Sequence, residues 1–147
     1  MGIWDWALEA YGRPGVPEAC LTLQDEHGQN TSLLLWAIYA EASDPDLLAR
    51  AAGAARAWDS VALKPLREIR RGLKQALPPV PDGAREALRA EVKDVELAAE
   101  RLLLETLESL APHRGGAPAL VALEAASEAW GIPAPPDALA ALAAALS

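Results

Sequence analysis

The feature that most constrains the fold is a run of eight apolar residues that follows three helix-capping residue types. Asn30, Thr31 and Ser32 have short side chains that accept hydrogen bonds from the free N–H groups of a helix start. Residues 33–40 then read Leu-Leu-Leu-Trp-Ala-Ile-Tyr-Ala. A helix that is apolar on every side must be surrounded by other elements. The sequence therefore predicts a buried central helix over about residues 31–42.

The rest of the chain favours further helices around that centre. Hydrophobic residues make up 52% of the sequence, most of them alanine and leucine, and there is no phenylalanine. Alanine and leucine are strong helix formers, and no stretch alternates in the manner of a strand. A chain of 147 residues is the size of one domain. We predict a single all-α domain over residues 1–147, a compact bundle of about seven helices whose longest member covers about residues 83–110.

Prolines divide the predicted helices and set the character of the last one. Pro65 lacks an N–H group, so we expect a kink or restart between Ser60 and Lys64. The final helix, residues 137–147, follows a proline-rich connector and carries only three leucines among alanines. We expect this helix to dock loosely and to offer its leucines to a partner, together with whichever of Trp4 and Trp6 faces outward.

Charge and cysteine content exclude several classes of protein. A formal charge of −8 disfavours binding to nucleic acid and to anionic membranes. The one cysteine, Cys20, rules out an internal disulfide and suits a reducing compartment. No stretch reaches the ~20 apolar residues that span a bilayer, and no signal peptide is visible. We therefore expect a cytoplasmic protein.

A polar cluster precedes the central helix and includes Gln24, Asp25, His27 and Asn30. Cys20 lies on the same helix face as His27, but two turns away, roughly 10 Å at 1.5 Å per residue, which is too far for a nucleophile and its base. One cysteine and two histidines are too few for a zinc site, so we expect neither a metal nor a cofactor. The cluster is either a set of buried polar groups that satisfy one another or part of a ligand site.

A basic segment follows the predicted kink, with five cations and one carboxylate. The cations are Lys64, Arg67, Arg70, Arg71 and Lys74, and the carboxylate is Glu68. Arg67, Arg70 and Arg71 are therefore candidates for binding an anion or an acidic partner.

Arg70, however, lies within the apolar stripe of its helix. On the long helix Glu96 lies within the stripe in the same way, and Glu100 lies at its edge. An unpaired buried charge is very costly. We therefore predict a structural ion network of Arg70, Glu96 and Glu100.

Residues of the first three predicted helices and two later groups form a recognisable pattern. These are Trp6-Ala7-Leu8, Tyr11, Val16, Ala19-Cys20-Leu21, Leu23-Gln24-Asp25, Gly28, Asn30 and Leu33-Leu34-Leu35-Trp36, then Leu66, Arg70 and Leu73, then Glu96, Glu100 and Arg101. In this pattern the chain resembles an uncharacterised family of proteobacterial helical proteins of ~150 residues, a domain of unknown function. The resemblance covers about residues 4 to 110. It implies a bacterial cytosolic helical protein and no activity.

Two functions remain open at this point, with a third as a remote alternative. The first is a non-enzymatic protein that acts through protein contacts, as an adaptor, regulator or assembly factor with a protein partner or a second copy. The second is a small-molecule or anion binder with a pocket near Gln24, His27, Asn30 and Arg70. The third is a hydrolase or transferase that uses His27 with Asp25. A cavity at the start of the central helix favours the binder, and a broad apolar surface favours the adaptor.

Overall fold

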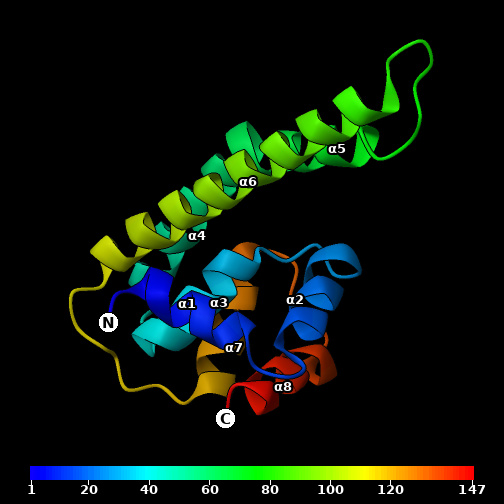
Figure 1. Ribbon diagram of the computed structural model, residues 1–147. Helices are drawn as coiled ribbons and strands as arrows, with labels where there is room; N and C mark the ends of the chain where they lie inside the picture. Colours follow the sequence, from blue (N-terminus) through cyan, green and yellow to red (C-terminus); the bar gives the residue numbers. More distant parts are fainter.

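The computed structural model describes residues 1–147 and consists of helices and connecting loops (Figure 1). The all-α prediction is confirmed. Eight α-helices and one π-helical segment follow one another along the chain. Their bounds are α1 Ile3–Tyr11, α2 Val16–Asp25, α3 Thr31–Ala40, α4 Pro45–Trp58, η1 Asp59–Leu63, α5 Lys64–Gly72, α6 Asp82–Leu110, α7 Ala119–Trp130 and α8 Pro136–Ala145.

Helix α3 is the buried central helix that the sequence predicts. The Asn30 side chain caps it by accepting a hydrogen bond from the Leu33 N–H at 2.9 Å. Residues 32–37 and Ala40 are all buried, and α3 packs against α1, α4, α6 and α7. A helix enclosed on so many sides has no polar face, which explains the unbroken apolar run.

Helices α4 and α5 form one rod that continues through η1. Because Pro65 has no N–H to donate, the helix widens before it, and the Lys64 N–H bonds to the Asp59 carbonyl instead of a residue four positions back. The predicted kink is therefore a π-helical segment inside a continuous helix. Counted with this rod as one element, the chain has the predicted seven helices.

The rod runs antiparallel to α6, the predicted long helix, which covers 29 residues. Their outer parts project beyond the other helices (Figure 1). We call residues 64–98 the arm and the remaining residues the body. Between Lys64 and Ala98 only Arg85 is buried. Its guanidinium donates to Glu86 on the same helix and to the carbonyl of Leu73 at the end of α5, and the second bond joins the two helices near the tip.

Helix α8 is more firmly packed than the sequence suggests. Leu139 and Leu142 are both buried, and α8 contacts α2 and α7. The expected leucine stripe is thus turned inward and belongs to the core. Trp4 and Trp6 are both partly buried against the core, so neither stands out as a partner surface.

None of the helices combines the length and apolar character that crossing a bilayer requires.

Candidate functional site

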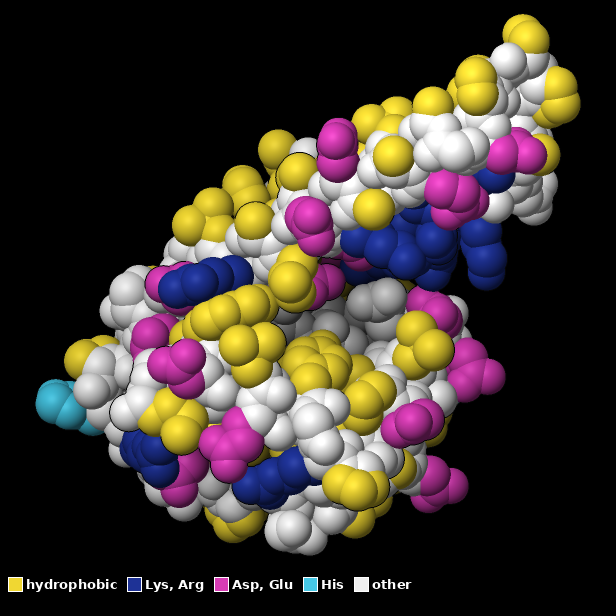
Figure 2. Space-filling model, in the orientation of Figure 1, with side chains coloured by type: hydrophobic (Ala, Val, Ile, Leu, Met, Phe, Trp, Pro, Cys, Tyr) yellow, Lys and Arg dark blue, Asp and Glu magenta, His cyan; other side chains and the backbone are white.

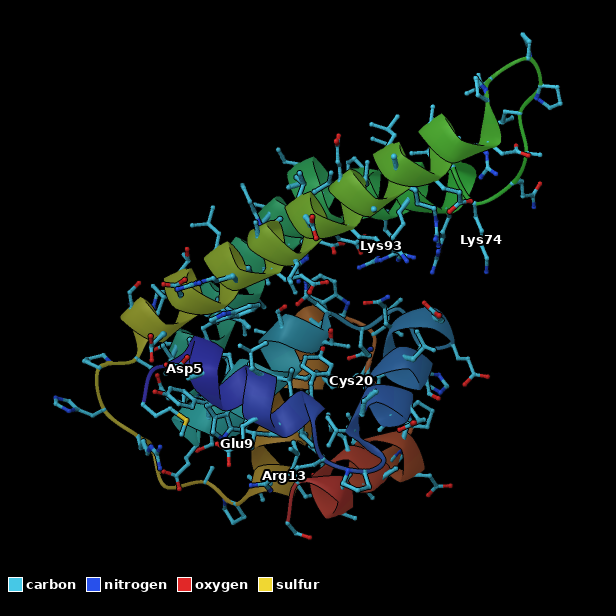
Figure 3. The ribbon with its side chains drawn as sticks, viewed as in Figure 1. Asp5, Glu9, Arg13, Cys20, Lys74 and Lys93 are labelled. Atoms are coloured by element: carbon cyan, nitrogen blue, oxygen red, sulfur yellow. The ribbon has the colours of Figure 1, made fainter.

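The candidate site is the side of the arm that faces the body. Arg67 and Arg71 lie four residues apart on α5, which places them on one helix face, and Lys74 lies in the turn that follows α5. Lys93 lies on α6 beside them, and Figure 3 shows Lys74 and Lys93 pointing down toward α2. We call these four residues the basic face.

Two residues of the basic face reach across to the end of α2. Arg67 Nη2 donates to Gln24 Oε1 at 3.3 Å, and Arg71 Nη2 donates to Asp25 Oδ1 at 3.0 Å. Gln24 and Asp25 are themselves linked at 3.4 Å. The polar cluster and the basic segment therefore meet in the structure, although the bonded residues are 43 and 46 positions apart in the sequence.

The ion pair predicted between Arg70 and the long helix lies at the inner edge of this contact. Arg70 Nε donates to Glu96 Oε1 at 2.7 Å, and the two side chains are 23% and 12% exposed. Glu100, one turn further along α6, forms no ion pair of its own. Burial and the neighbouring Glu96 carboxylate raise the pKa of Glu100 to about 7, although Arg67 and Arg70 act in the opposite direction.

Two lysines of the basic face have no partner. Lys74 and Lys93 form neither an ion pair nor a hydrogen bond, and both are exposed. Figure 2 shows the surface hollowed between the arm and the body, with Lys and Arg side chains along the upper wall of the hollow and acidic and apolar groups along the lower one. We call this hollow the cleft. It offers free positive charge to an anionic group.

A small cavity lies beside the cleft, between α1, α2 and α6. It has a volume of about 130 Å³, and it is lined by Tyr11, Cys20, Gln24, Thr31 and Glu100 among others. Burial raises the pKa of Cys20 to about 11, so the thiol stays protonated at neutral pH. Burial, with a smaller contribution from Cys20, also raises the pKa of Tyr11. These groups pack and bond locally and do not supply a ready nucleophile.

Other members of the predicted polar cluster have structural roles. Asn30 caps α3. Gln29 is buried, accepts a hydrogen bond from Ser127 Oγ at 2.8 Å, and donates to the Ile132 carbonyl at 2.8 Å. The His27 imidazole forms no hydrogen bond or ion pair with any residue of the cleft, and its backbone carbonyl accepts from Gln29. The cluster therefore divides: Gln24 and Asp25 face the arm, whereas Gln29 and Asn30 secure the helix start.

Sequence reasoning missed Lys93 and Ser127. Lys93 precedes Glu96 by three residues and Glu100 by seven, so it shares their face of α6, and a helical wheel is enough to find it. Ser127 gives no such signal, because its partner Gln29 lies 98 residues away. No three His, Cys, Asp or Glu side chains lie close enough together to hold a metal ion.

The fold and the cleft define an all-helical protein with a projecting arm whose inner face is basic. Residues 2–107 match a family described as protein of unknown function, DUF2390. The chain belongs to this family. The matched region contains α1 to α5 and most of α6, so it includes the arm and both walls of the cleft, whereas α7 and α8 lie outside it. Neither the curated proteins nor the solved structures contained a match.

Proposed function

We propose that this protein is a non-enzymatic adaptor or assembly factor that binds an acidic segment of a partner protein in the cleft. The observation that carries the proposal is the pair of free lysines, Lys74 and Lys93, beside two arginines that already bond across the cleft. A carboxylate that enters there gains charge-assisted hydrogen bonds without first breaking an ion pair of Lys74 or Lys93.

The size of the cavity beside the cleft favours a protein segment over a small molecule at this site. Pockets that enclose small ligands usually have volumes of roughly 300–1,000 Å³, whereas the cavity at the start of α3 has about 130 Å³. The sequence also suggested a pocket formed by Gln24, His27, Asn30 and Arg70. Two of these residues do not contribute to it, because the Asn30 side chain caps α3 and the His27 imidazole does not bond to any residue of the cleft. An extended segment needs only the open cleft.

The charge of the body favours a short acidic segment over a nucleic acid. The arm holds eight Lys and Arg against six Asp and Glu, whereas the body holds five against fifteen. A long polyanion on the basic face would be repelled by the body. A segment with two or three carboxylates touches only the cations.

The catalytic alternative has little support in the geometry. It requires His27 to act with Asp25, yet the Asp25 carboxylate bonds to Arg71 and Gln24 and not to His27. A general base must lie within hydrogen-bond reach of its partners. We therefore place Asp25 with the wall of the cleft.

The test is to reverse the free charges. Lys74→Glu, Lys93→Glu and the double variant are compared with wild type by fluorescence anisotropy, using as the probe a short fluorescein-labelled peptide that contains three consecutive glutamates between glycine and serine residues. We expect each single change to weaken binding about threefold and the double change at least about tenfold, because screened surface pairs each contribute roughly 0.2–1 kcal/mol. Raising the salt concentration should reduce the wild-type affinity.

Arg50→Glu is the matched control, since Arg50 is an exposed cation on α4 without an ion pair. It changes the net charge as each single variant does, but away from the cleft, and should bind like wild type. An equal loss in this control, or wild-type binding no tighter than that of the double variant, would contradict the proposal. Inorganic phosphate that displaces the peptide at similar concentration would instead favour the small-anion alternative.

A further inference from the structure

The arm has a second face, which points away from the body and is apolar. We call Ile69, Leu88 and Val95 of the arm, together with Val61 and Leu102 at its base in the body, the outer face; their exposed fractions lie between 49% and 75%. At ~100° per residue, Val95 lies roughly opposite Lys93 on α6, and Ile69 lies roughly opposite Arg67 on α5. Figure 2 shows the same division, with hydrophobic side chains along the upper edge of the arm and basic ones beneath it.

The arm has no hydrophobic core of its own. Helix α5 contains no buried residue, and the one buried residue between Lys64 and Ala98 is Arg85. An amphipathic helix pair normally buries its apolar side against another element. A further layer of helices on the outer face would supply that core.

We propose that this layer is the arm of a second copy of the chain, packed antiparallel so that the two arms form a four-helix bundle. Leu88, Val95 and Leu102 are spaced seven residues apart, the repeat that lets two helices keep one seam together. A two-fold axis beside Val95 brings Leu88 of one copy opposite Leu102 of the other. The face is therefore complementary to itself, as an isologous dimer requires.

The same two-fold axis places apolar side chains near the tip of one arm opposite a groove at the base of the other arm. A groove of about 360 Å³ at the base of the arm is lined by Ala54, Ala57, Trp58, Val61, Leu102, Leu103 and Thr106. Nearer the tip, Ile69 and Leu88 lie at one level along the arm, because Arg89 Nε donates to the Arg70 carbonyl at 3.2 Å. The axis beside Val95 carries this pair onto the groove of the other copy.

Charge selects the antiparallel arrangement. Each body holds five Lys and Arg against fifteen Asp and Glu, so parallel arms would bring two strongly acidic bodies together. Antiparallel arms keep the bodies at opposite ends. They also lay each arm, with eight cations against six anions, toward the acidic body of the other copy.

The area available is that of a stable dimer. Helix α6 has 29 residues, which at 1.5 Å each gives a length of about 43 Å, and two adjacent helices are about 20 Å wide. Such a face approaches the ~800 Å² per partner of a standard protein interface.

The first test measures mass in solution by light scattering and sedimentation. The chain has a mass of 15.5 kDa, and we expect the wild type to have twice this mass. Val95→Lys should be monomeric with unchanged circular dichroism, since it places two like charges on the axis. Val121→Lys, the same substitution at an exposed apolar position of α7, should remain dimeric.

The second test locates the axis by cross-linking. With Cys20→Ser as the background, Val95→Cys should be joined to its counterpart by a short bis-maleimide, whereas Val121→Cys should not. A wild type that stays monomeric at ~100 µM would overturn the proposal, and so would a dimer that survives Val95→Lys. The result is independent of the acidic-segment proposal, because Lys74→Glu with Lys93→Glu should leave the dimer mass unchanged.

Discussion

The pKa of Glu100 depends on the charged and buried groups around it at the edge of the cleft. It lies against the small cavity, next to Glu96 and near Arg67 and Arg70, and its pKa of about 7 means that it is only partly charged at neutral pH. The unfolded chain exposes the same carboxyl to water, where its pKa is near 4.5. Between these two values the folded protein holds a proton that the unfolded chain has released.

The stability of the fold should therefore fall as pH rises from about 4.5 to about 7, and this contribution should then level off. Glu100→Gln removes the free-energy cost of ionising a partly buried carboxyl. We therefore expect the variant to be more stable than wild type by on the order of 1–3 kcal/mol at pH 8 and about equal to it near pH 4. Urea unfolding at several pH values measures the difference. Glu91→Gln, at an exposed position on the same helix, is the control; a Glu100→Gln profile that follows the wild type throughout would show that Glu100 carries no such cost.

At the level of single residues, an ion pair could be predicted from the sequence where a charged residue interrupts the apolar stripe of each of two helices. Arg70 and Glu96 each interrupt an apolar stripe, and they lie 2.7 Å apart. Gln24 with Arg67 and Asp25 with Arg71 were identified as candidates, but their pairing depends on how α5 passes over α2. That placement is a tertiary property, so residue types and periodicity alone do not reveal it.

At the level of elements, starts and ends were predicted well where local chemistry decides them. Asn30 caps α3 and Asp44 caps α4 through their side chains, and Pro65 marks the π-helical segment. Asp82 and Asp137 are of a residue type that often caps helices, but they lie inside the first turns of α6 and α8, which Pro81 and Pro135 precede. The docking of α8 was misjudged, because a short alanine-rich helix owes its position to the surfaces it meets and not to its own pattern.

The burial of α8 leads to a prediction about the stability of the whole fold. Leu142 is completely buried, so Leu142→Ala leaves a cavity and should lower the free energy of unfolding by about 2–5 kcal/mol. Leu120→Ala, at an exposed position of α7, should change it by less than about 1 kcal/mol. Chemical denaturation compares the two variants. Equal small effects would mean that α8 is only loosely attached in solution, as the sequence first suggested.

At the level of the whole molecule, the arm separates two kinds of surface. Its inner face is basic and looks onto the acidic body, whereas its outer face is apolar. Since almost nothing in residues 64–98 is buried, the arm adds little to the core of the monomer. Ordering a projection of this kind costs conformational entropy, and burial within the monomer offsets little of that cost, so we expect contacts with other molecules to stabilise its surfaces.

The last prediction separates these two roles of the arm. The two ends of the arm are close together, because η1, which directly precedes the arm, packs against α6, and a short glycine-serine linker can therefore replace residues 64–98. We expect the shortened chain to remain helical and to melt cooperatively, because all buried apolar residues lie in the body. It should be monomeric and should not bind the glutamate peptide.

Circular dichroism, thermal melting and light scattering on the shortened chain provide the answer. As a control, the same linker inserted at the tip between Val80 and Pro81 keeps both faces of the arm and should keep dimerisation and binding. A shortened chain that fails to fold would make the arm part of the structural core. A folded one that still dimerises would place the contact on the body. Because the body carries a large excess of acidic residues, removing the basic arm should also lower the isoelectric point, which isoelectric focusing can verify independently of folding.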